Sequence, residues 1–149
     1  MRRSMAVALI AVLVMIVPMA EGAAPAKRYV GTFEPGGTLK FSVKKRNGNR
    51  KVVRFKFAGF PVQCTSGSQT HSEVLNFPLP VNRRDRFRAI GVLGNPQNPR
   101  ARLRLKGKVD GPRKAHGTMQ VDGSKLPIDA GGTAACDSPK TKWDASRPQ

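Results

Sequence analysis

Residues 101–109 read ARLRLKGKV, and this stretch decides the fold because apolar and basic side chains alternate along it. Successive side chains of a β-strand point to opposite faces, so a period of two predicts a strand with one buried and one solvated face. The residues expected to face inward are Leu103, Leu105 and Val109. The residues expected to face outward are Arg102, Arg104, Lys106 and Lys108.

Two earlier segments alternate in the same way, and Asn47-Gly48 between them is a dipeptide typical of tight hairpin turns. They are residues 38–43 (TLKFSV) and residues 51–60 (KVVRFKFAGF). The side chains expected on the inner face of this hairpin are Leu39, Phe41, Val43, Val53, Phe55 and Phe57. Those expected on the outer face include Lys40, Arg54 and Lys56.

The rest of the chain contains short segments with strand character, separated by turn-forming residues, and no helical periodicity. Further strands are expected at residues 71–77, 87–93, 116–121, 126–136 and 140–145. Gly123 is expected to turn the chain, residues 94–99 to form a plain loop, and Trp143 to be the last core anchor. About nine or ten short strands indicate an all-β fold, either an antiparallel β-sandwich or a small barrel. We expect one domain over residues 27–145, followed by a frayed tail at residues 146–149.

The N-terminus has the three-part layout of a secretory signal peptide over residues 1–22. Arg2 and Arg3 precede an apolar run at residues 5–17, which is shorter than the roughly 20 residues of a transmembrane helix. Small residues follow Pro18, and cleavage is expected between residues 20 and 26. The sequence therefore predicts a protein that is secreted or associated with the cell envelope, with no membrane span after cleavage.

The chain has two cysteines, Cys64 and Cys136, and both lie in the part expected to be exported. An even number of cysteines in an oxidising compartment predicts one disulfide. Closing so long a loop would stabilise the fold by about 4 kcal/mol in the chain-entropy treatment. Metal ligation by these two cysteines is disfavoured, because no CxxC pair or neighbouring histidine pair accompanies them.

The C-terminal segment CDSPKTKWDA, from Cys136 to Ala145, is similar to a C-x-S-G-x(3)-W-x-A ending. That ending belongs to an uncharacterised family of small secreted β-rich bacterial proteins. The chain also resembles this family at Asp85-Arg86-Phe87 and Ala115-His116-Gly117. Pro139 and Arg86 stand where the family pattern has glycine. The resemblance implies fold and export, and it implies no activity.

Nothing in the sequence indicates catalysis. His71 and His116 are the only histidines, and the chain lacks an HExxH, GxSxG or Walker motif. The aspartates lie mostly in turn-like contexts and form no D-x-D-x-D-G calcium loop. We therefore expect a non-catalytic protein with no cofactor and no metal site.

Charge is the strongest anomaly, because 27 basic residues face only 9 acidic ones in 149 residues, a net charge of +18. Loss of Arg2, Arg3 and Glu21 with the signal peptide removes two cations and one anion and leaves +17. A field of this sign attracts polyanions, whereas a surface that is merely soluble mixes both signs. The residues expected to bind anions are Arg102, Arg104, Lys106 and Lys108, with Lys40, Arg54 and Lys56 as helpers.

The leading prediction is a secreted basic domain that associates electrostatically with anionic cell-envelope polymers or lipid headgroups. Nucleic acid would bind only unspecifically, since no RNA-binding motif or aromatic stacking platform is visible. One alternative is a structural or protein-recognition domain with an exposed apolar patch. Another is a hydrolase or transferase whose pocket would hold His71 or His116 beside a carboxylate or hydroxyl. Positive charge that serves solubility alone is the simplest alternative.

Overall fold

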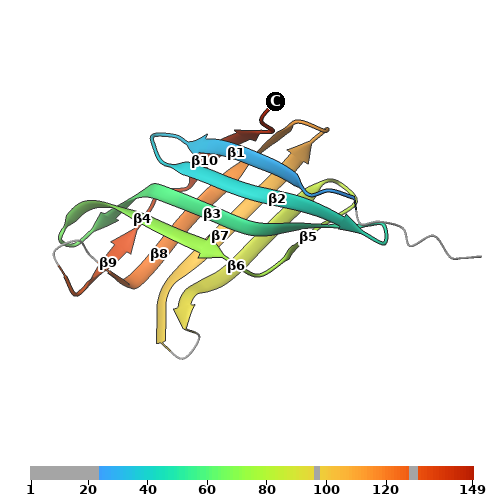
Figure 1. The fold of residues 1–149 in the computed structure, drawn as a ribbon. Helices are drawn as coiled ribbons and strands as arrows, with labels where there is room; N and C mark the ends of the chain where they lie inside the picture. The colour runs from blue at the N-terminus through green and yellow to red at the C-terminus, as the bar shows by residue number, and fades with distance from the viewer. Residues whose placement is uncertain (1–23, 96–97, 128–130) are drawn as a thin grey trace, which may run out of the picture.

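The protein folds into one antiparallel sheet that curls until six of its strands close into a barrel, as a computed structural model shows (Figure 1). The structure describes residues 24–95, 98–127 and 131–149, so the expected signal peptide at residues 1–22 lies outside the described residues. The strands are β1 (Lys27–Phe33), β2 (Thr38–Arg46), β3 (Asn49–Cys64), β4 (Gly67–Leu75), β5 (Leu79–Val81), β6 (Arg86–Asn95), β7 (Asn98–Asp110), β8 (Lys114–Pro127), β9 (Thr133–Asp137) and β10 (Thr141–Ser146). The predicted all-β class, strand count and antiparallel pairing are confirmed.

The strand order is β10-β1-β2-β3-β9-β8-β7-β6, and a further pairing of β10 with β8 closes the barrel. Strands β7 and β6 continue the sheet beyond the barrel, and β4 and β5 pair with the edge of β3 that β2 does not use. In Figure 1, β1 to β4 form a front layer and β6 to β8 run behind it. The two layers therefore present their outer faces to opposite sides of the molecule. The described residues contain no helix that could span a membrane.

One edge of β8 joins the two layers, because it pairs with β10 along its first half and with β9 along its second. Ser138 lies between β9 and β10 and keeps them in line with β8. Its N–H donates to the Val121 carbonyl at 2.7 Å, and its Oγ accepts the Val121 N–H at 2.8 Å. The expected turn at Gly123 is wrong: Gly123 lies opposite Cys136 inside β8, because β9 supplies pairing partners beyond it.

The predicted disulfide between Cys64 and Cys136 is confirmed. Cys64 ends β3 and lies directly opposite Cys136 on the penultimate strand, with their Cα atoms 3.9 Å apart. The bond therefore fastens the end of β3 in the front layer to β9, which pairs with β8.

A β-bulge changes which valine of β3 faces the core. The register of β2 and β3 shifts between Lys40 and Ser42, and Arg54 adopts a φ of 53° at that point. An extra residue on one strand reverses the phase of the alternation. The expectation that Val53 faces inward is therefore wrong, since Val52 is fully buried and Val53 is only half-buried.

Several strands are longer than the sequence predicts. The expected strand at residues 71–77 begins already at Gly67 and ends at Leu75. Strand β6 ends at Asn95 and β7 begins at Asn98, so both strands reach into the plain loop expected at residues 94–99. At the C-terminus, Arg147 donates its N–H to the Arg113 carbonyl at 2.9 Å, so hydrogen bonding continues past residue 145.

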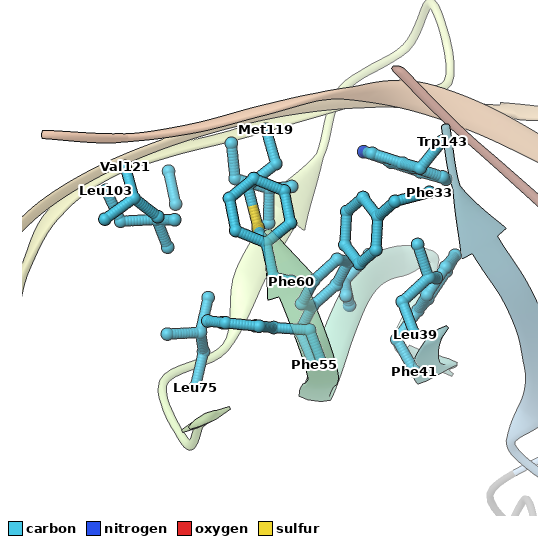
Figure 2. Close-up of a cluster of buried hydrophobic side chains, with 14 of the residues drawn as sticks. Phe33, Leu39, Phe41, Phe55, Phe60, Leu75, Leu103, Met119, Val121 and Trp143 are labelled. Atoms are coloured by element: carbon cyan, nitrogen blue, oxygen red, sulfur yellow. The ribbon is translucent and has the colours of Figure 1, made fainter. Parts of the chain in front are cut away.

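The core between the layers is a cluster of buried hydrophobic side chains (Figure 2), in which Phe41 contacts several aromatic rings. Its ring centroid lies 5.0 Å from that of Tyr29, 5.5 Å from Phe55 and 5.9 Å from Trp143. Aromatic contacts of this geometry stabilise a core beyond the area that they bury. Trp143 is 1% exposed, so its predicted role as a core anchor is confirmed. The inward residues predicted for β7 are buried as well: Leu103, Leu105 and Val109.

Two glycines let aromatic rings lie against the inner side of the sheet. Gly107 and Gly117 lie opposite each other on β7 and β8. A Cβ built on Gly107 would clash with the Phe87 ring, and one on Gly117 would clash with the Trp143 ring and the Lys106 carbonyl. These positions therefore tolerate no side chain without movement of the core.

Gly117→Ala and Gly107→Ala should each lower the free energy of unfolding by about 1–3 kcal/mol, because an added methyl overpacks the core. Urea denaturation of the oxidised protein measures this loss. Gly36→Ala is the matched control, since a Cβ there meets nothing within 4 Å. If Gly117→Ala were as stable as Gly36→Ala, the close packing of Trp143 on β8 would be refuted.

Candidate anion-binding face

The four cations predicted on residues 101–109 lie in one row on the outer side of β7. Arg102, Arg104 and Lys106 are exposed and Lys108 is half-buried, while the residues between them face the core. Alternate residues of a strand lie about 6.8 Å apart, so the row is about 20 Å long. The predicted strand and its two faces are confirmed. The anion-binding role of the row stays a prediction.

Strand β6 places two more cations beside this row. Arg86 lies opposite Lys108, and Arg88 lies opposite Lys106. Side chains directly opposite on antiparallel strands are about 5 Å apart at Cβ, and like charges there are destabilising. We call the combined surface the cationic face; its members are Arg86, Arg88, Arg102, Arg104, Lys106 and Lys108. The sequence shows Arg86 and Arg88 as a basic cluster, but only the strand register shows that they lie beside β7.

Most of the cationic face forms no salt bridge within the described residues, although Arg102 lies opposite the exposed Asp122 on β8. Among the residues that the structure describes, no carboxylate oxygen lies within 4.0 Å of any face cation other than Lys108. Lys108 Nζ lies 2.7 Å from Asp110 Oδ1, and His116 Nδ1 contacts the other carboxylate oxygen of Asp110. The hydrogen bond from Lys108 is the main reason that the pKa of Asp110 lies below its ordinary value, and the nearby His116 lowers it further.

The three helper residues of the sequence prediction lie on the other layer. Lys40 and Lys56 are opposite each other on β2 and β3, and Arg54 occupies the β-bulge. All three are exposed. The structure therefore does not bring them together with the row on β7, and they reach an anion bound there only through the long-range field.

A trough of about 460 Å³ crosses β6, β7, β8 and β10 at one end of the cationic face. Its floor is the backbone of Gly107 and Gly117, with the Trp143 ring packed beneath. The side chains around it come from four strands: Arg86, Lys106, Lys108, His116, Thr118, Lys142 and Asp144. A second hollow of about 400 Å³ continues along the face and is lined by Arg88, Ile90, Arg102, Arg104 and Lys106. No sequence motif marks Thr118 and Lys142. Only the pairing of β7, β8 and β10 shows that both residues lie in one row with Lys106.

Both histidines have a carboxylate neighbour. His71 Nε2 lies 2.9 Å from Glu73 Oε2, and the His71 ring packs on Phe57. His116 is paired with Asp110 at the rim of the trough. In the described part of the chain, neither histidine is hydrogen-bonded to a hydroxyl, and no three potential metal ligands of the His, Cys, Asp and Glu types converge. The arrangement offers charge and hydrogen-bond donors to an anion.

Comparison with known proteins identifies no relative: no family model, no curated protein and no solved structure matches the chain. The resemblance of the segment around Cys136 and Trp143 to secreted bacterial proteins therefore stays a prediction.

Lys108→Met should raise the pKa of Asp110 towards its ordinary value of 3.8, because the main group that stabilises the carboxylate is removed. An NMR titration of the Asp110 carboxyl carbon measures the change. Lys106→Met is the matched control, since it removes one charge from the same strand without contacting Asp110. Equal shifts in the two variants would contradict a direct Lys108–Asp110 interaction.

Proposed function

We propose that this protein is a secreted, non-catalytic module that binds anionic polymers of the cell envelope through its cationic face. The observation that carries the proposal is the pairing of Arg88 with Lys106 across two strands, without a carboxylate within 4.0 Å among the described residues. Such a pair costs about 0.2–1 kcal/mol in the free protein. A bound polyanion would offset that cost by neutralising both charges.

The layout of the face fits a polymer better than a small ligand. The row on β7 is about 20 Å long, and the hollows beside it are open to solvent and lie end to end, sharing Lys106. A long, shallow, positive surface can contact several anionic groups of one chain at once, and electrostatic attraction speeds its capture. Binding of this kind weakens with salt because ions screen exposed charges.

A structural or protein-recognition role has less support. The large hydrophobic side chains exposed among the described residues are Val74, Phe77 and Ile90, which lie on β4, the β4–β5 connection and β6. Single exposed apolar residues are ordinary on soluble proteins. A hydrolase or transferase would need a histidine beside a carboxylate or hydroxyl in a pocket, and His116 does lie beside the Asp110 carboxylate at the rim of the trough. This alternative still has less support, because in the described part of the chain neither His71 nor His116 is hydrogen-bonded to a hydroxyl that could act as a nucleophile.

The double variant Arg88→Gln/Arg104→Gln should weaken binding to poly-L-glutamate, used as a model polyanion, by about tenfold or more at low salt, and should reduce the slope of log K against log salt by about two. Lys40→Gln/Lys56→Gln removes the same charge from the other layer and should change affinity much less. Isothermal titration calorimetry over a range of salt concentrations measures both effects. Equal losses in the two variants, or affinity that does not depend on salt, would refute the proposed face.

Anionic lipid is a second candidate, and Ile90 is the observation that favours it. This side chain is 73% exposed and lies opposite Arg104, two residues from Arg88. An apolar side chain among cations can insert between headgroups while the cations contact phosphates. Ile90→Ser should then weaken binding to phosphatidylglycerol vesicles severalfold in a sedimentation assay and leave poly-L-glutamate binding unchanged. Unchanged vesicle binding in Ile90→Ser would count against the lipid candidate.

A further inference from the structure

The trough lies between two cross-strand rows of outward side chains. One wall consists of Lys106, Thr118 and Lys142 on β7, β8 and β10. Arg88 continues this cross-strand row on β6, outside the trough. The other wall is the row Arg86, Lys108, His116 and Asp144 on the same four strands. The two walls are separated by two residues along each strand, about 6.8 Å. The trough therefore has a defined width that is suited to one anionic group.

The first wall combines charged lysines with the uncharged hydroxyl of Thr118. A surface that attracted anions through charge alone would not need this hydroxyl. Thr118 lies opposite Lys106 on one side and opposite Lys142 on the other. Neighbouring strands are about 4.8 Å apart, so the backbones of Lys106 and Lys142 flank Thr118 and lie about 10 Å from each other. Thr118 is half-buried, and the structure records no hydrogen bond of its hydroxyl within the described residues.

The second wall is held in place by Asp110. This carboxylate contacts Lys108 and His116 Nδ1, which orients the histidine and leaves its second ring nitrogen available. Asp144 closes the same wall on β10 and repels an anion there. The positive part of the trough is therefore the region between Arg86, Lys106 and Lys142.

We propose that this trough is a subsite for a phosphate group, so that the polyanion bound by the cationic face is a phosphate-bearing polymer; this inference rests on the proposed function. A tetrahedral phosphate directs oxygens to several sides and can accept from two lysines and a hydroxyl together. A carboxylate is planar and has two oxygens, so it accepts from fewer directions, whereas the fork of an arginine such as Arg86 matches carboxylate and phosphate alike. Donors from three adjacent strands line the same trough, and this arrangement favours the phosphate.

The charge-neutral variant Thr118→Val tests the subsite, because a purely electrostatic surface would not respond to it. It should weaken binding of inorganic polyphosphate by roughly tenfold, the order expected for one hydrogen bond to a charged oxygen. Binding of poly-L-glutamate should stay unchanged at the same ionic strength. Thr118→Ser keeps the hydroxyl and should retain the affinity for polyphosphate. Near-ultraviolet circular dichroism of each variant checks that the Trp143 environment beneath the trough is intact.

A charge variant with a matched control completes the test. Lys142→Gln should weaken polyphosphate binding more than Lys140→Gln, since Lys140 is also exposed but lies outside the trough. In an NMR titration, inorganic phosphate should shift the amide signals of Thr118 and Lys142 and not those of Lys40 or Lys56.

The outcomes separate this inference from the function on which it rests. Absence of salt-sensitive binding to both polymers would overturn the proposed function. Salt-sensitive binding of both polymers with no effect of Thr118→Val would leave that function in place and overturn the phosphate subsite. Phosphatidylglycerol vesicles distinguish the source of the phosphate: an affinity that depends on Thr118 and is confined to vesicles would overturn the polymer assignment.

Discussion

The structure depends on the backbone pairing of one edge of β8 with both β9 and β10. Strand β9 connects that edge to the end of β3, and β10 connects it to β1. Ser138 maintains this arrangement, because its hydrogen bonds to Val121 bridge the break between the two strands. Without this shared edge, the layer that carries the cations would not be closed onto the layer that carries most of the aromatic core.

The closed barrel also explains how a row of like charges can persist. Lys106 and Arg104 alternate with Leu103 and Leu105, whose burial stabilises β7 by several kcal/mol, more than the cost of placing cations side by side. The Phe87 and Trp143 rings press against Gly107 and Gly117 from inside, so the sheet beneath the trough is firmly packed. The outer side chains therefore project from a rigid support, which is the condition for presenting donors at fixed spacing.

Much of this fold is predictable from local patterns, and the failures have identifiable physical causes. The alternation of residues 101–109, the turn at Asn47-Gly48 and the disulfide follow from strand geometry and cysteine count. The alternation of residues 51–60 predicts Val53 on the inner face, and this prediction fails because the bulge at Arg54, opposite Phe41, leaves no clear signal in the sequence. A glycine such as Gly123 predicts a turn, and this prediction fails because β9, which follows later in the chain, pairs with β8 at and beyond Gly123.

The sequence by itself determined the charge, the disulfide between Cys64 and Cys136, and which face of β7 is basic. Each of these follows from composition or from the two-residue period of a strand. Only the tertiary structure decided that Arg86 and Arg88 lie beside that face, that Lys40 and Lys56 lie on the other layer, and that Thr118 stands between two lysines. The physical reason is that strand order and register are set by the closure of the whole sheet, which no local stretch of sequence encodes.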